Sequence, residues 1–180
     1  MSGIIGSVGS KSGLIGETEP IISEIDSWRF TTTQAGNQSP VSANLERTDV
    51  NFFVKRGAGM THSSGIFSYP RTGIWRVSFQ WYGYSQGNNR YIFAVCQSSS
   101  DSGSNYNTTA VAKTHISDIG EYGHGSCFCQ GYLNVTDIST YRTKFIIDVD
   151  GSGSAVSTQG SSGENNTYML FERVARSPYN

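Results

Sequence analysis

The clearest strand pattern in the chain is the stretch Ile74-Trp75-Arg76-Val77-Ser78-Phe79-Gln80-Trp81-Tyr82. From Trp75 onward, large apolar side chains at odd-numbered positions alternate with more polar side chains at even-numbered positions. Successive side chains of a β-strand point to opposite faces of a sheet. This period of two therefore predicts a strand with one buried face.

The composition of the 180 residues indicates that the rest of the chain is also built from strands. Ile and Val occur 25 times and aromatic residues 22 times, whereas Leu occurs only four times. β-Branched and aromatic residues favour strands, and scarce Leu argues against helices. Gly, Ser, Thr and Asn supply 74 residues, which is typical of polar turns and loops. The length corresponds to one domain.

Further strands are expected on both sides of the first one. The segment 91–96 is apolar on both faces, as in a central or interface strand, and the segments 127–135 and 141–149 each have one apolar face. A last strand is expected over 167–174, and turn-rich loops over 85–89, 98–107 and 151–166. The only helix expected is a short one over Glu19–Asp26. These elements predict an all-β, two-sheet sandwich or jelly roll.

The residues around the first strand resemble the signature of the C1q/tumour-necrosis-factor-like jelly roll. That signature is Gly-x-Phe, then Pro, then Gly-x-aromatic-x-Phe, and its direct matches here are Gly65, Phe67, Pro70 and Gly73. Trp75 replaces the usual Tyr, Val77 replaces the usual Phe, and Ser139-Thr140 stands where a Gly-Asp pair is common. The resemblance covers residues 28–175. It implies a jelly roll that assembles as a homotrimer around an apolar three-fold axis.

The N-terminal residues differ from the rest. Gly3-Ile4-Ile5-Gly6 returns ten residues later as Gly13-Leu14-Ile15-Gly16. Ordering a glycine-rich segment costs backbone entropy. We therefore expect residues 1–27 to be an arm held by a neighbouring subunit or partner protein, with residues 28–180 as the jelly-roll domain. The anchors would be Ile4, Ile5, Leu14 and Ile15; the alternative is an arm packed on its own domain.

The arm also resembles the short segments that begin many virion proteins of marine tailed bacteriophages. The likeness rests on Met1–Gly6 and Gly9–Gly13. It implies attachment to the particle through the arm, with the β domain facing outward. The partners implied are other virion proteins of the capsid or tail.

Charge and motifs exclude several other functions. A net charge of −1 with scattered Lys and Arg does not favour nucleic acid. No apolar stretch is long enough for membrane insertion, and no signal peptide is visible. Three cysteines are an odd number, which fits thiols made in a reducing host cytoplasm. No nucleophile elbow, catalytic carboxylate pair or phosphate-binding loop is present, so we expect a non-enzyme without cofactors.

Two sequence features could still bind a metal. Asp148 and Asp150 begin a stretch with the oxygen spacing of a calcium loop, but Gln159 stands where the bidentate carboxylate would be. Cys127 and Cys129 lie on one face of a strand without the second ligand pair that zinc requires. The alternative for Asp148 and Asp150 is a strand that ends in a turn. The alternative for Cys127 and Cys129 is that they are small buried hydrophobic residues. A Cys127–His124 nucleophile pair is a weaker alternative.

Tyrosines are the best candidates for ligand contacts. Tyr82, Tyr84, Tyr106 and Tyr122 fall at strand ends or in loops, beside Asn and Ser. Such surfaces make adaptable contacts at low entropy cost, and flat rings stack on sugars, so a host glycan is one candidate ligand. The alternative is that these tyrosines border a trimer interface.

The sequence thus favours a non-enzymatic bacteriophage virion protein, located in the virion as a capsid decoration, head fibre or short tail fibre. The alternative is a lectin-like module that recognises a host surface glycan or protein. A metal-dependent hydrolase built on a jelly roll is a third reading.

Overall fold

The computed structural model describes residues 22–50, 53–87, 89–117, 121–150 and 155–178. These residues form strands and no α-helix, in agreement with the all-β expectation. The strands are β1 (Glu24–Phe30), β2 (Gln34–Ala35), β3 (Leu45–Arg47), β4 (Thr61–Ser63), β5 (Ile66–Ser68), β6 (Gly73–Ser85), β7 (Asn89–Ser99), β8 (Asn107–Ile116), β9 (Gly123–Val135), β10 (Arg142–Val149), β11 (Val156–Thr158) and β12 (Tyr168–Ala175).

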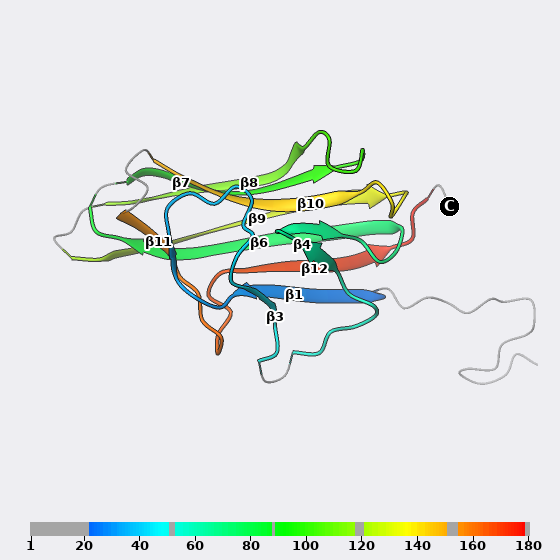
Figure 1. Cartoon of the computed structure of the whole chain (residues 1–180), viewed down its shortest axis with the longest axis horizontal. Helices are drawn as coiled ribbons and strands as arrows, with labels where there is room; N and C mark the ends of the chain where they lie inside the picture. Colours follow the sequence, from blue (N-terminus) through cyan, green and yellow to red (C-terminus); the bar gives the residue numbers. More distant parts are fainter. Residues whose placement is uncertain (1–21, 51–52, 88, 118–120, 151–154, 179–180) are drawn as a thin grey trace, which may run out of the picture.

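Two antiparallel sheets stack as the layers of a jelly-roll sandwich (Figure 1). The seven-stranded sheet has the order β2-β11-β6-β12-β1-β3, and β9 pairs with the other edge of β6 along its whole length. The five-stranded sheet has the order β4-β5-β10-β7-β8. The two-sheet architecture predicted from the sequence is therefore confirmed.

The strand that opened the sequence analysis is the longest in the seven-stranded sheet, together with β9. Its odd-numbered side chains Trp75, Val77, Phe79 and Trp81 are fully buried, as their alternation predicted. The expected strands at 91–96, 127–135, 141–149 and 167–174 correspond to β7, β9, β10 and β12. The expected loop over 151–166 contains one more short strand, β11, which pairs with β2 and β6.

The signature residues lie where the chain passes from one sheet to the other. Phe67 on β5 belongs to the five-stranded sheet and Gly73 begins β6 of the seven-stranded sheet, so the turn at Pro70 joins the two layers. Gly65 has φ 77°, and a Cβ there would lie 2.0 Å from the carbonyl oxygen of Val41. Glycine is the residue that tolerates both conditions.

Aromatic rings from both sheets meet around Phe67. Its ring centroid lies 5.7 Å from that of Trp28 on β1, 5.7 Å from that of Phe145 on β10 and 5.0 Å from that of Phe171 on β12. Phe67 is fully buried. The ring therefore contacts side chains of both layers in the core.

The structure corrects the helix expected over Glu19–Asp26 in its described part, residues 22–26. Glu24–Asp26 are not helical but begin β1, which pairs with β12 on one side and β3 on the other. The expected boundary after residue 27 falls inside this strand, so the jelly roll begins by Glu24 and any arm ends before it. The physical reason is that both acidic side chains face the interior and are compensated there.

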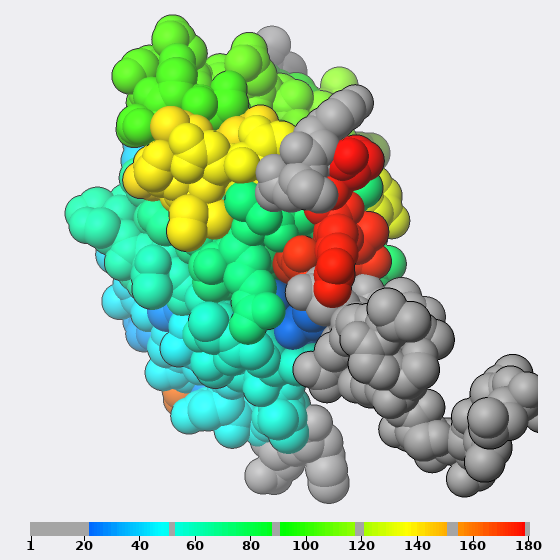
Figure 2. All heavy atoms as spheres, turned by 90° about the vertical axis from the view of Figure 1, so that its right-hand side faces the viewer, coloured from blue at the N-terminus to red at the C-terminus, as the bar shows by residue number. Residues whose placement is uncertain are grey.

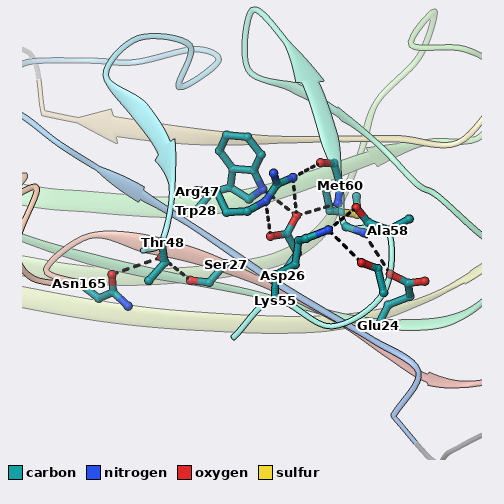
Figure 3. A network of polar contacts seen from close by, with 12 residues as sticks. Glu24, Asp26, Ser27, Trp28, Arg47, Thr48, Lys55, Ala58, Met60 and Asn165 are labelled. Atoms are coloured by element: carbon teal, nitrogen blue, oxygen red, sulfur yellow. Dashed lines mark hydrogen bonds and ion pairs between the residues drawn. The ribbon is translucent and has the colours of Figure 1, made fainter. Parts of the chain in front are cut away.

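Part of that compensation comes from residues 53–60, a loop folded over β1, and part from Arg47 on β3 (Figure 3). The carboxylate of Asp26 accepts hydrogen bonds from Arg47 Nε at 2.8 Å, from Met60 N at 2.7 Å and from Trp28 Nε1 at 3.0 Å. Glu24 accepts one from Gly59 N at 3.1 Å and forms an ion pair with Arg71 at 2.9 Å. The buried carboxylate of Asp26 therefore holds the loop against β1 through its hydrogen bond from Met60 N.

The same loop lies against the strand through its backbone. Ile25 and Arg56 exchange two backbone hydrogen bonds, at 3.1 and 3.0 Å. Gly57 has φ 77°, and a Cβ there would lie 2.0 Å from Glu24 Oε2, so only glycine allows this approach. Figure 2 views this end of the molecule, where β1 (blue) shows only in small patches between the cyan and teal residues.

Candidate functional site

The outward face of the seven-stranded sheet carries large exposed apolar side chains. Phe128 and Tyr132 on β9 are 49% and 56% exposed, and half-buried Leu170 on β12 lies on the same face. We call the surface formed by these three residues, two of which are aromatic, the aromatic face. Large exposed aromatic groups on a flat sheet are typical of a surface that another molecule covers.

A group of four rings lies at the end of this sheet, where β6 ends and β9 begins. Tyr82 and Tyr84 come from β6 and His124 comes from β9. Tyr122 is the residue immediately before β9. We call these four residues the tyrosine–histidine cluster. The register places Tyr84 directly opposite His124.

The rings of this cluster contact one another in two geometries. Tyr82 and His124 are stacked, with centroids 5.8 Å apart and planes 19° apart, and Tyr82 Oη lies 3.2 Å from His124 Nδ1. Tyr84 and Tyr122 meet edge to face, with centroids 5.3 Å apart at 84°. Tyr84, Tyr122 and His124 line a cavity of about 320 Å³.

A second, more polar pocket of about 450 Å³ adjoins the cluster through Tyr82. We call it the amide pocket. Its lining residues are Gln80, Tyr82, Ser126, Asn165, Asn166 and Tyr168. They come from β6, β9 and β12 and from the loop before β12, so the pocket follows the outward face of the same sheet.

Three of the four tyrosines expected to contact a ligand are therefore together, and one is not. Tyr106 precedes β8 in the other sheet, where Lys144 Nζ lies 4.1 Å from its ring centroid. From the sequence, His124 is proposed only as the partner of Cys127 in a nucleophile pair. The structure places His124 exposed on the outward face of β9 and Cys127 on the inward side, three positions further along, so they do not form a nucleophile pair.

The three cysteines are free, and Cys96 and Cys129 are buried in the core. The interpretation of Cys127 and Cys129 as small buried hydrophobic residues is thus confirmed for Cys129, whereas Cys127 is half-buried and packs against the core. Burial raises the pKa of the Cys127 and Cys129 thiols to about 11 and also raises that of Cys96. Within the described part of the chain, no three His, Cys, Asp or Glu side chains are grouped to hold a metal ion.

The raised thiol pKa values predict slow alkylation of the native protein. At pH 8 the thiolate fraction should be about 100-fold lower than in the unfolded chain, because the pKa is about two units higher. We expect iodoacetamide to modify Cys127 and Cys129 about 100-fold more slowly in buffer than in urea, with a rate that still rises between pH 9 and 11. Mass spectrometry of quenched samples measures this. Equal rates in buffer and urea would contradict it.

The other expected site residues have separate outcomes. Asp148 is exposed on β10 and Asp150 is half-buried after that strand, but the remainder of the calcium-loop stretch, residues 151–154, lies outside the described residues. The anchors Ile4, Ile5, Leu14 and Ile15 also lie outside them. Among the described residues, no helix is long and apolar enough to cross a membrane.

The two stacked antiparallel sheets form a jelly roll with a TNF-like fold, as the sequence resemblance implied. A crystal structure of murine APRIL at pH 5.0 is similar, with a TM-score of 0.57 and 12% identity over 83% of this chain and 98% of that chain. A second structure of murine APRIL, at pH 8.5, gives a TM-score of 0.55 and 13% identity with the same coverage. At this identity the likeness shows the fold alone. No protein-family model and no curated protein matches the sequence.

Proposed function

We propose that this protein is a non-enzymatic, homotrimeric display protein of a virion. Its arm attaches it to the capsid or tail, and its jelly roll faces outward as a capsid decoration, head fibre or short tail fibre. The arm comprises the residues before β1, which begins at Glu24. The protein would be made in the host cytoplasm, where its buried thiols stay reduced.

The observation that supports the assembly in this proposal is the aromatic face. Phe128 and Tyr132 project from β9, and burying each ring would remove a large apolar area from water. The sequence resemblance to C1q/TNF-like domains favours a trimer over other assemblies. Attachment through the arm rests on the likeness of residues 1–13 to phage virion segments and on its paired aliphatic residues.

Native mass spectrometry tests the assembly. We expect the full chain to be a trimer and the double variant Phe128→Asp, Tyr132→Asp to be a monomer, because six buried carboxylates per trimer would have no partners. The matched control is Val111→Asp, an exposed apolar position (53%) on β8 of the other sheet, which should stay trimeric. A monomeric wild-type chain, or a trimeric double variant that keeps its circular dichroism spectrum, would overturn the proposed assembly.

Binding to particles that lack this protein tests the attachment. The full chain should bind, and a full-length variant with Ile4, Ile5, Leu14 and Ile15 all changed to Asp should not. Its control changes Ser7 and Ser12 of the same arm to Asp and should still bind. If the first variant binds as well as the wild type, attachment through the arm is wrong.

A lectin-like module is the second candidate function, and the tyrosine–histidine cluster favours it. Both candidates share the trimeric display of the domain. They differ in whether particle attachment depends on the arm, so the same experiment separates them.

A further inference from the structure

We propose that the tyrosine–histidine cluster and the amide pocket together bind a neutral carbohydrate. The inference rests on the proposed display function, because an outward-facing trimer would present three copies of this site. It names the chemistry of the ligand, the residues that contact it and the end of the sheet where it binds.

The ring geometry fits a sugar. A pyranose ring has faces of C–H groups and a rim of hydroxyls, so it packs its face on an aromatic ring and hydrogen-bonds at its edge. The edge-to-face pair Tyr84–Tyr122 presents two ring planes at 84°, which form a corner. Together with His124 these rings line a cavity of about 320 Å³, within the size range of small-molecule sites.

The neighbouring groups fit the rim of the sugar. Asn165 and Asn166 each carry an amide with both a donor and an acceptor, and Ser126 carries a hydroxyl. Tyr82 lines the amide pocket and also stacks on His124 of the cluster, so the two cavities are adjacent. A saccharide of more than one unit could therefore place one ring in the aromatic corner and its hydroxyls among the amides.

The described lining of the two cavities favours a neutral sugar. None of the described residues that line the two cavities is Asp, Glu, Lys or Arg. Phosphate, sulfate and carboxylate groups are recognised through Arg or Lys, and nucleic acid requires a cationic surface. The lining thus argues against phosphorylated, sulfated or sialylated ligands.

The position of the tyrosine–histidine cluster is compatible with trimer assembly, and the amide pocket lies between the cluster and the aromatic face, because Gln80 of that pocket pairs with Phe128. Along β9, His124 lies eight positions from Tyr132 and four from Phe128, or about 27 and 14 Å at the rise of a strand. The cluster is thus at one end of the sheet, and the aromatic face lies further along it. Three sites at one end of a trimer would bind a multivalent glycan with increased avidity.

A glycan array tests the proposal with the full chain. The array carries neutral hexose and N-acetylhexosamine oligosaccharides beside sialylated and sulfated ones. We expect neutral glycans to bind, and Tyr84→Ala and Tyr122→Ala each to lose about tenfold or more in affinity, the scale of one aromatic stacking contact. Tyr106→Ala is the matched control, a tyrosine beside β8 of the other sheet, and should bind as the wild type does.

Several results would overturn the proposal. One is a folded wild-type trimer that binds no neutral glycan, or acidic glycans only; another is undiminished binding by Tyr84→Ala. If Tyr84→Ala or Tyr122→Ala turns the trimer into a monomer by native mass spectrometry, the cluster belongs to the assembly surface instead. If the wild-type trimer binds no glycan but binds a host surface protein at the tyrosine–histidine cluster, the carbohydrate proposal is also wrong. Loss of particle binding on changing the arm tests the display function separately, because those substitutions leave the array result unchanged.

Discussion

Replacing Asp26 with asparagine is expected to lower the free energy of unfolding by about 2–3 kcal/mol, because a buried carboxylate that accepts several hydrogen bonds is replaced by an amide with one acceptor oxygen. The asparagine would keep the size of the side chain but would turn an N–H₂ group toward donors. Asp26 now accepts from Arg47, from the Met60 amide and from the Trp28 indole. Donors that lose their acceptor in the interior cost about 1–3 kcal/mol each.

Urea denaturation of the variant and the wild type at equal protein concentration measures the effect, because assembly makes stability depend on concentration. The control is Asp148→Asn, an exposed aspartate on β10, which should change stability by less than about 0.5 kcal/mol. Equal losses for the two variants would contradict the role given to Asp26. A double-mutant cycle with Arg47→Met should show coupling between the two side chains.

Truncating Phe67 to alanine is expected to cost about 3–5 kcal/mol, the range for a fully buried aromatic ring. The ring contacts Trp28, Phe145 and Phe171 and so joins both sheets. Its removal leaves a cavity in the middle of the core, which the two rigid layers can only partly fill.

The matched variant is Phe67→Leu, which keeps much of the volume and should cost under about 1.5 kcal/mol. Chemical denaturation followed by tryptophan fluorescence reports both variants, because Trp28 packs against this ring. If leucine and alanine destabilise equally, the loss does not come from the cavity.

Local periodicity was sufficient to predict most of the long strands, but not β8 (Asn107–Ile116), which has few large apolar side chains. The alternation around Trp75 and the apolar faces at Cys129 and Phe145 identified β6, β9 and β10 with their correct buried sides. Gly65, Pro70 and Gly73 carried the family resemblance, and the structure places them around the turn that joins the two sheets. Each of these signals lies within a few neighbouring residues.

The start of the domain could not be predicted in this way. Glu24 and Asp26 suggest a solvated helix when only their neighbours in sequence are considered. Their burial depends on Gly59 and Met60, which fold back onto β1 from far along the chain. Strand β11 escaped prediction for a similar reason, since its three residues are held by pairing with β2 and β6.

The candidate site was predictable in its residue types but not in its grouping. Tyr82, Tyr84 and Tyr122 stood out beside polar neighbours, but nothing local associates them with His124. That association follows from the register of β6 and β9, which sets Tyr84 opposite His124. Tyr106 lies apart because it precedes a strand of the other sheet.

The position of β12 constrains how the protein is made. This strand lies between β1 and β6, at the centre of the seven-stranded sheet, although it is the latest strand of the domain to leave the ribosome. Until it emerges, β1 and β6 have open edges that can pair with other chains. The seven-stranded sheet can therefore be completed only after β12 has been synthesised, and until then the open edges of β1 and β6 are the places where we expect nascent chains to aggregate.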